Sequence, residues 1–386
     1  MPQKKMLKLA TTLLAPASAH GTWKNTPIEN FIHQPLSAYQ KLIQTAEEGK
    51  LDFVFQPDRY AMLASPTDIT YKNNLWLEPI TLLTALLPCT SRIGLAATAS
   101  TIYNEPYHIA RMFASIDHLS SGRAAWNVVS SRGDFENINF GKTDLLPEEE
   151  RAAYTEEFLH VVKKLWDSWE DEAVILNKRE GIFADATKLH VTNHQGDYFD
   201  IQGPLSISRP PQGHPVIIQA GVSEHFKERA AETADIIFTM LPTLDIAKTF
   251  YKDVKKRLVT YKRQHHELLI MPGAQIIVGN TVEEAYQKKK HYEEQTIHLQ
   301  AMQSTGRHAS FIGTPQTIAD EMAQWLHEEG ADGFIFIPTV LPEGLDDFVH
   351  KVVPVLQQRG VFKKDYMNAT LRENLGLLRP RNTHLS

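Results

Sequence analysis

The chain contains a single cysteine, Cys89, in 386 residues. One thiol excludes an intrachain disulfide and a zinc site built from several cysteines. No histidine or carboxylate stands beside it in the apolar run LLTALLPCTSRIGL, so we expect a buried structural thiol rather than a nucleophile. His190 and His194 are four residues apart, but HVTNH lacks the glutamate and the helical pattern of a zinc motif, and no metal site is expected.

Long apolar runs and an excess of positive charge are also missing. No stretch approaches the roughly 20 apolar residues that span a bilayer, so no membrane segment is expected. The net charge of −6 disfavours binding to nucleic acid. No GxGxxG follows an expected strand, and neither GxSxG nor the glycine-lysine phosphate loop occurs. Dinucleotide-binding, serine-hydrolase and nucleoside-triphosphatase sites are therefore not indicated.

The N-terminal segment MPQKKMLKLATTLLAPASAHG combines lysines, an apolar stretch and small residues, as secretory signals do. Lys8, Thr11 and Thr12 interrupt that stretch, and the same residues are needed for the first expected strand. We therefore expect a cytoplasmic protein.

Short apolar strands alternate with amphipathic helices along the chain, which is typical of parallel β/α units. We predict strands at Lys8–Ala15, Asp52–Gln56, Ile93–Ala97, Ala124–Val129, Pro215–Gln219, Asp235–Thr239, Ala274–Val278 and Gly333–Ile337. We predict helices at Ser37–Glu48, Pro79–Pro88, Ile109–Leu119, Glu148–Trp169, Ser223–Thr233, Leu244–Lys262, Val282–Leu299, Pro315–Glu329 and Leu345–Gln358. Eight parallel strands close a barrel, so the predicted fold class is α/β, a (β/α)8 TIM barrel with insertion segments. An open, doubly wound sheet is the alternative.

A polar, turn-rich segment at about residues 170–213 is too long for an ordinary loop. We expect a small excursion there, with a hairpin of His190–Val191 against Tyr198–Ile201. No other composition change divides the chain, so residues 1–386 are predicted to form one domain.

Small polar side chains occur where consecutive strands are expected to end. Thr98 follows one strand, Asn127 lies near the end of the next, and Asp58 comes just after DFVFQ. In a (β/α)8 barrel the active site is built at that rim. Hydroxyl and amide groups can bind a ligand there, whereas turn or cap roles are the alternative for each of the three.

Three segments carry a resemblance to a known family. They are YNEPYHIARMFASIDHLSSGRAAWNVVSS, PQGHPVIIQAG and TLRENLGL. Together they resemble the flavin-dependent monooxygenases related to bacterial luciferase, in the group of nitrilotriacetate and dibenzothiophene-sulfone monooxygenases. The resemblance covers roughly Leu7 to Pro380. It implies a barrel, reduced FMN and O2 as co-substrates, a separate NAD(P)H-dependent flavin reductase as partner, and a homo-oligomer.

The resemblance places flavin contacts at Asp58, Thr98 and Asn127. Ser223 is expected to cap a helix through the N–H of Phe226, and the backbone donors of this helix start would suit the FMN phosphate. The resemblance also implies a role for Arg151, which stands where the family's long helix carries an arginine. The predicted cofactor-binding set is Asp58, Thr98, Asn127, Arg151, Gly221, Val222 and Ser223.

The sequence departs from the family pattern in two places. Glu148 and Ala152 stand where the family carries histidine and tyrosine, which predicts weaker phosphate binding or a different local geometry. The region at about 296–311 is shorter than in the family and predicts a reduced lid over the substrate.

His20, Tyr103 and Trp126 are the predicted walls of the substrate pocket. Packing is the alternative for each of the three. His108 begins a helix, where capping or packing is equally consistent, and no residue is singled out as catalytic.

The function predicted from the resemblance is an FMN-dependent two-component monooxygenase that oxygenates a small organic molecule. An F420-dependent oxidoreductase of the same barrel family and a non-catalytic flavin-binding protein are the alternatives.

Overall fold

A computed structural model describes residues 5–13, 22–62, 70, 73, 75–131, 134–142, 144, 146–296 and 308–385. Eight parallel strands form a closed ring. They are β1 (Lys8–Thr12), β2 (Phe53–Gln56), β3 (Gly94–Ser100), β4 (Ala124–Val129), β9 (Val216–Ala220), β10 (Ile236–Thr239), β11 (Leu269–Val278) and β13 (Gly333–Phe336). β1 pairs with both β2 and β13 and so closes the ring, which confirms the predicted barrel.

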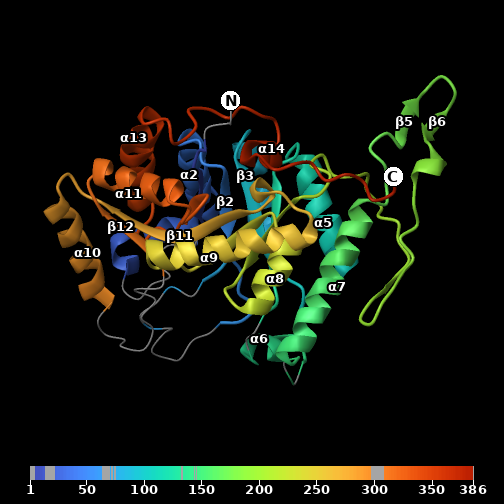
Figure 1. The fold of residues 1–386 in the computed structure, drawn as a ribbon, viewed down its shortest axis with the longest axis horizontal. Coiled ribbons are helices and arrows are strands. Elements are labelled where there is room, and N and C mark those ends of the chain that lie inside the picture. Colours follow the sequence, from blue (N-terminus) through green and yellow to red (C-terminus); the bar gives the residue numbers. More distant parts are fainter. Residues whose placement is uncertain are drawn as a thin grey trace.

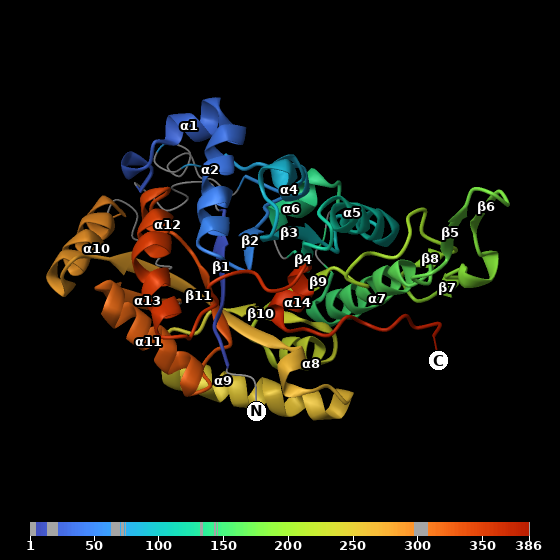
Figure 2. The same ribbon diagram turned by 90° about the horizontal axis from the view of Figure 1, so that it is seen from above.

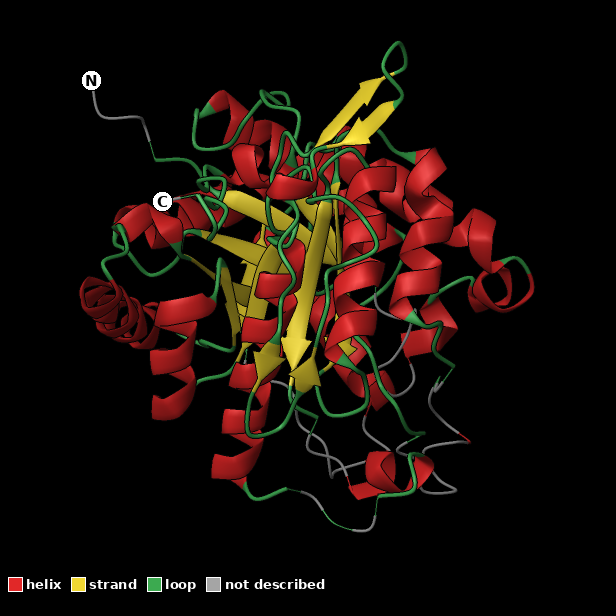
Figure 3. Cartoon of the chain, turned by 90° about the vertical axis from the view of Figure 1, so that its right-hand side faces the viewer, coloured by secondary structure: helices red, strands yellow, loops and turns green. Residues whose placement is uncertain are grey.

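Helices surround the strands on the outside (Figure 2). The strand arrows in Figure 3 point to one end of the barrel, so the loops that follow them gather at one mouth. The main helices are α2 (Pro35–Glu48), α4 (Pro79–Leu86), α5 (Pro106–Leu119), α7 (Glu148–Trp166), α8 (Glu224–Thr233), α9 (Leu244–Arg257), α10 (Val282–Thr296), α11 (Pro315–His327) and α13 (Val353–Gln358).

Helix α5 shows how the sequence determines one of these elements. Pro106 stands at the first helical position, where its missing N–H costs nothing. Ile109 and Phe113 are buried at helical spacing and pack in the layer between helices and strands. The helix ends at a turn in which Ser121 and Gly122 adopt positive φ angles of 57° and 87°. The chain can therefore reverse directly into β4.

The alternation of side chains along each strand separates two apolar layers. One layer fills the interior of the barrel and includes Ala10, Phe53, Phe55, Ala96, Ala125, Val216, Ile218, Met271 and Ile335. The other faces the helices and includes Leu9, Val54, Leu95 and Trp126. A residue's place along its strand thus decides whether it can reach a ligand at the mouth.

The seventh strand differs from the prediction. β11 begins at Leu269, five residues before the predicted start, and its first half pairs with β10. Its second half, from Ala274, pairs with an additional strand, β12 (Ala309–Gly313). Pro272 and Gly273 disfavour a strand locally. Glycine is nevertheless needed at position 273, because a Cβ there would lie 2.7 Å from His308 Nδ1. The predicted lid at 296–311 thus includes the start of β12, and its residues 297–307 lie outside the described part of the chain.

The predicted excursion contains two small hairpins. β5 (Val174–Asn177) pairs with β6 (Ile182–Ala184), and β7 (His194–Gln195) pairs with β8 (Asp200–Ile201). The predicted hairpin strand at His190–Val191 was wrong, because the chain there is held by a bridge between Trp169 and Leu189 instead. Figure 1 and Figure 2 show the β5–β6 hairpin projecting away from the barrel.

The end of the barrel opposite the mouth is closed by the C-terminal segment. Leu371 and Leu375 of α14 (Leu371–Leu375), with Leu377, join the apolar layer inside the barrel. Three aspartates that directly precede strands, Asp52, Asp235 and Asp332, lie at this end, and we refer to them as the floor aspartates.

Each floor aspartate accepts a hydrogen bond from a neighbouring strand's backbone. The donors are the N–H groups of Leu9, Ile217 and Ile270, at 2.7, 2.8 and 2.9 Å. Each carboxylate also pairs with a buried cation: Asp52 with Lys363, Asp235 with Arg372 and Asp332 with Lys255. The floor is therefore a set of neutralised, hydrogen-bonded carboxylates.

Candidate active site

Thr98 and Asn127 lie on neighbouring strands and face the barrel interior. They are paired in the β3–β4 register, and the Asn127 amide donates to Thr98 Oγ1 at 2.9 Å. Each follows an inward-facing alanine, Ala96 or Ala125, by two residues, so alternation turns both toward the interior. They lie two residues before the ends of β3 and β4, so Thr98 is deeper than predicted, whereas Asn127 lies at its predicted place.

Among the described residues, two buried oxygens at inward-facing strand positions lack hydrogen-bond partners. They are Asn127 Oδ1 and Thr12 Oγ1. Thr12 follows the inward-facing Ala10 on β1 and is paired with Phe55 of β2. A buried polar atom without a partner costs roughly 1–3 kcal/mol, so such atoms indicate a place where a ligand completes the structure.

Asp58 lies two residues after β2, half-buried at the mouth. Its Oδ1 accepts a hydrogen bond from the Arg59 N–H at 2.8 Å. The pKa of Asp58 is raised to about 6, chiefly by burial and also by the nearby carboxylates of Glu78 and Glu136, while the hydrogen bond from the Arg59 N–H opposes the shift. The side chain can therefore exchange a proton close to neutral pH.

The junction between β9 and α8 has the predicted cap. Ser223 Oγ accepts the Phe226 N–H at 3.3 Å, and the helix starts at Glu224. A Cβ at Gly221 would lie 2.7 Å from the Phe226 ring, so glycine is required for the chain to pass. Val222 is 55% exposed. Lys227 and Arg257 bind the Glu224 carboxylate at 2.6 and 2.5 Å, which partly offsets its negative charge beside this helix start.

Helix α7 begins at Glu148, and its first-turn side chains differ in burial. Glu148, Glu149 and Glu150 are exposed, whereas Arg151 is buried and donates from Nη1 to the Leu146 carbonyl at 2.9 Å. Solvent therefore screens the charges of the three glutamates.

The predicted pocket walls have three different outcomes. His20 lies outside the described residues. Tyr103 is half-buried near the mouth, where its hydroxyl donates to Asn137 Oδ1 at 2.8 Å. The prediction for Trp126 was wrong. Its side chain is fully buried between strands and helices, against Phe113, Phe158 and Trp166, because its place on β4 turns it outward.

A cluster of polar and aromatic residues around Asp58 was not predicted from the sequence. The Tyr60 ring lies 5.2 Å from the Tyr103 ring and 5.6 Å from the Phe140 ring. The Tyr60 hydroxyl accepts hydrogen bonds from the Ser100 N–H and from Asn104 Nδ2, both at 3.1 Å. The only signal in the sequence was the position of Tyr60 two residues after Asp58, in PDRY.

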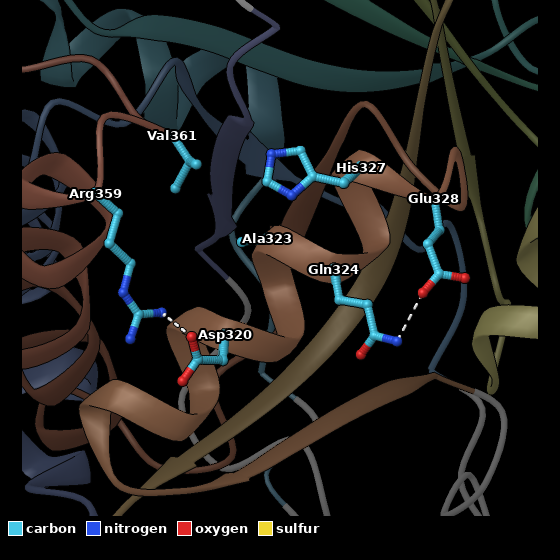
Figure 4. A pocket seen from close by; sticks show the side chains of 7 residues that line it. All are labelled: Asp320, Ala323, Gln324, His327, Glu328, Arg359 and Val361. Carbon is cyan, nitrogen blue, oxygen red and sulfur yellow. Dashed lines mark hydrogen bonds and ion pairs between the residues drawn. The ribbon is translucent and has the colours of Figure 1, made fainter.

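Two surface hollows lie away from this site. The larger, of about 460 Å³, is formed by the outer side of α11 together with Arg359 and Val361 (Figure 4). An ion pair between Arg359 and Asp320, at 2.8 Å, spans it. Val361 accepts the N–H of Leu7, just before β1, so this hollow lies toward the floor of the barrel. The other, of about 330 Å³, lies between α4 and α5.

Within the described residues, no group of three or more histidine, cysteine, aspartate or glutamate side chains could hold a metal ion. None of the helices in the part that the structure describes is long and apolar enough to cross a membrane.

Comparison with known proteins connects this geometry to a family. N-acetyl-S-(2-succino)cysteine monooxygenase of Bacillus subtilis (strain 168) is 38% identical over 99% of both chains. Nitrilotriacetate monooxygenase component A of Aminobacter aminovorans is also 38% identical over 99% of both chains. The two alignments span 442 and 448 positions, so both relatives contain residues that this chain of 386 lacks.

A solved structure of riboflavin lyase with modified FMN and riboflavin superposes with a TM-score of 0.87 at 26% identity, over 97% of both chains. Residues 13–333 match the family described as luciferase-like monooxygenase. These matches confirm the resemblance: the chain belongs to the luciferase-like monooxygenase family and is an enzyme of that kind.

Proposed function

We propose that this protein is the oxygenating component of a two-component FMN-dependent monooxygenase. It takes reduced FMN from a separate NAD(P)H-dependent flavin reductase and uses O2 to oxygenate a small organic substrate in the cytoplasm. The observation that carries this proposal is the barrel mouth, where buried oxygens without partners lie below a half-buried carboxyl group. Family membership supplies the reaction type.

The inner end of the mouth fits the ring system of a flavin. Asn127 Oδ1 is an unused acceptor for a ring N–H, and Thr12 Oγ1 is an unused hydroxyl that can donate to a ring oxygen or nitrogen. Thr98, bound to Asn127, fixes the orientation of the amide. Beside the pair, Ala96 and Ala125 contribute only small side chains to the barrel interior, which favours binding of a flat ligand there.

The start of α8 fits the FMN phosphate. Its first backbone N–H groups and the positive end of the helix dipole attract an anion. Gly221 lets the chain approach closely, and Val222 still provides a backbone donor. Arg151 would add positive charge from α7.

The bound cofactor supplies the electrons that activate O2. The chain's own residues bind and orient the ring through Thr12, Thr98 and Asn127. Asp58 holds or releases a proton at its carboxyl group at the mouth. The aromatic cluster of Tyr60, Tyr103 and Phe140 excludes water from one side of that carboxyl.

The test is flavin binding followed by turnover. Quenching of flavin fluorescence should report a complex with FMN, and anaerobic titration should report one with reduced FMN. With a flavin reductase, NADH and ¹⁸O2, mass spectrometry of an amine, thioether and sulfone panel should find one labelled oxygen in a product. Absence of binding in either redox state would exclude the proposal, tighter binding of reduced F420 would favour the F420 alternative, and binding without labelled product from an extended panel would favour a non-catalytic protein.

We also propose that the protein is a homo-oligomer. The projecting β5–β6 hairpin leaves Leu176 and Phe183 60% and 65% exposed. A lone two-stranded hairpin is marginally stable in water, so contact with a second copy would stabilise it.

A further inference from the structure

Helix α6 (Asp134–Asn139), at the mouth end of the barrel (Figure 1), turns a polar side chain inward and apolar side chains outward. Asn137 is only 2% exposed, and its Oδ1 accepts the Tyr103 hydroxyl at 2.8 Å. Phe135 and Ile138, one helical turn apart, are 65% and 70% exposed. A surface helix normally buries its apolar side, so the orientation of α6 is the reverse of the usual one.

Hydrogen bonds to two neighbouring segments fix this orientation. Asn139 Nδ2 donates to the Tyr60 carbonyl at 2.8 Å, and the Tyr60 N–H donates to Glu136 Oε1 at 3.3 Å. Just after the helix, Lys142 Nζ donates to the Ile102 carbonyl at 2.7 Å. Polar contacts thus hold the inner side of α6 against the segments that follow β2 and β3, and its apolar side must face outward.

Further exposed apolar side chains lie beside α6. The Phe140 ring is 5.6 Å from the ring of Tyr60, which stands two residues before Met62. Trp76 Nε1 donates to the Pro57 carbonyl at 2.9 Å and so brings the segment around it to the same place. We define the apolar rim as six side chains that are 40% to 70% exposed: Met62, Leu75, Leu77, Phe135, Ile138 and Phe140.

The charged groups on the same segments disfavour an anion. Asp58, Glu78 and Glu136 contribute carboxyl groups. The two cations, Arg59 and Lys142, are both engaged: the Arg59 guanidinium carbon is 5.3 Å from the centre of an aromatic ring, and Lys142 is bound to a backbone carbonyl. A ligand that carried a carboxylate would therefore meet like charges at the rim without a free cation on these segments to pair with.

We propose that the apolar rim binds a neutral, largely apolar organic molecule and discriminates against molecules that carry carboxylates. The rim belongs to segments that follow β2 and β4, and such segments form the active site in a (β/α)8 barrel. A protein partner that covered the rim permanently would obstruct this mouth, so a small ligand is the occupant that fits. That this ligand is the molecule to be oxygenated rests on the proposed function, whereas the binding preference does not.

The test compares two probes that differ by one charge. Methyl phenyl sulfide and 4-(methylthio)benzoate share the ring and the thioether, and only the second carries a carboxylate. Equilibrium dialysis against the full chain, with and without FMN, should show the neutral sulfide binding about 10-fold more tightly or better. The result is overturned if the two probes bind equally or if the benzoate binds more tightly.

Ile138→Lys and Phe135→Lys place a cation on the rim at exposed positions. Each should weaken binding of the sulfide and strengthen binding of the benzoate, so that the ratio of their affinities falls about 10-fold. Leu119→Lys is the matched control, because Leu119 is 68% exposed at the end of α5 that leads into β4, on the floor side. It should leave both affinities unchanged, and an equal effect of all three variants would contradict the inference.

Two further measurements separate the inference from its alternatives. If light scattering shows a fall in mass for Ile138→Lys, a second copy of the chain covers the rim and the inference is wrong. If neither oxidised nor reduced FMN binds while the neutral sulfide is still preferred, the proposed function fails and the apolar binding site stands. If FMN binds while neither probe is preferred, the inference fails and the proposed function stands.

Discussion

At the scale of single residues, the candidate site is made of groups that cost stability in the folded protein. Asn127 Oδ1 and Thr12 Oγ1 are buried without partners among the described residues, and Asp58 is held in surroundings that disfavour its charge. Such groups are typical of binding sites, because a ligand supplies what the chain leaves unsatisfied. Substitutions here should therefore affect binding and stability in opposite directions.

Asn127→Leu tests, in the barrel interior, whether binding and stability change in opposite directions. The change removes the unpartnered oxygen, so we expect FMN affinity to fall about 10-fold or more, the loss of about 1.4 kcal/mol. Thermal unfolding of the ligand-free protein should show no loss of stability beyond about 1 kcal/mol, because removing the unsatisfied oxygen offsets the loss of the single hydrogen bond from the amide to Thr98. A large loss of stability with unchanged affinity would instead assign Asn127 to packing.

Asp58→Asn tests, at the barrel mouth, whether a site residue lowers the stability of the folded protein. The folded pKa of about 6 lies above the ordinary value of 3.8, so the wild type loses stability as the pH rises from 4 to beyond 6. The asparagine variant avoids that loss and should be more stable by about 1–2 kcal/mol at pH 8, with no difference near pH 3.5. Urea unfolding at both pH values measures the effect. Asp200→Asn, at an exposed aspartate on β8, is the control and should show no such pH dependence.

At the scale of elements, the barrel is stabilised by the floor aspartates and the C-terminal segment. Burial alone would raise the pKa of Asp235 and of Asp332, but Arg372 and Lys255 hold both below their ordinary values. The floor thus stabilises the fold at neutral pH and loses this contribution when the pH falls below about 4.

Arg372→Met measures one of these contacts. Arg372 is 3% exposed and binds both carboxylate oxygens of Asp235, at 2.9 and 2.7 Å. Removing it leaves a buried unpaired charge, which should lower the free energy of unfolding by about 3–5 kcal/mol. Adding Asp235→Asn should recover part of the loss. Arg379→Met is the matched control: its pair with Asp171 is about 40% exposed on both sides and should contribute less than about 1 kcal/mol.

Element boundaries show which parts of the fold could be predicted. β4 was predicted at its observed bounds, because an apolar run there is flanked by turn residues. The start of β11 and the whole of β12 were missed, because Pro272 and Gly273 suggest a break and the pairing that overrides it comes from residues 309–313. Trp126 was misplaced for a related reason: composition shows that a strand is buried but does not show which of its faces points inward.

The candidate site was predictable to a similar degree. Thr98, Asn127 and Ser223 were found because strand ends and helix caps have local signatures, although their roles toward a cofactor are still predictions. Tyr60 and Asn104 are 44 residues apart, and only the fold brings their side chains together. Contacts of that kind leave no pattern in a single sequence.

At the scale of the whole molecule, the β5–β6 hairpin is the feature that the barrel does not need. The Asp185 N–H already donates to the Ala173 carbonyl at 2.8 Å, so the two ends of the hairpin lie together. The residues that flank the hairpin can therefore be joined by a short linker without moving from their positions.

Replacing residues 174–184 with two glycines should leave the melting temperature within a few degrees of the wild type. If the hairpin contacts a second copy, light scattering should show the mass falling from that of an oligomer to that of the 43.7 kDa chain. Phe183→Glu should have the same effect on the mass. An unchanged mass in both variants would place the interface elsewhere, and a monomeric wild type would contradict the proposed oligomer.

The two ends of the barrel thus have separate roles. The floor holds charge pairs and buried leucines that stabilise the fold, and the mouth holds the groups proposed to bind the ligand. A laboratory that randomised the segments following the strands, while keeping Asp52, Asp235, Asp332 and their cations intact, should recover folded proteins at high frequency. The same fold would then serve as a stable scaffold for selecting enzymes with new substrate preferences.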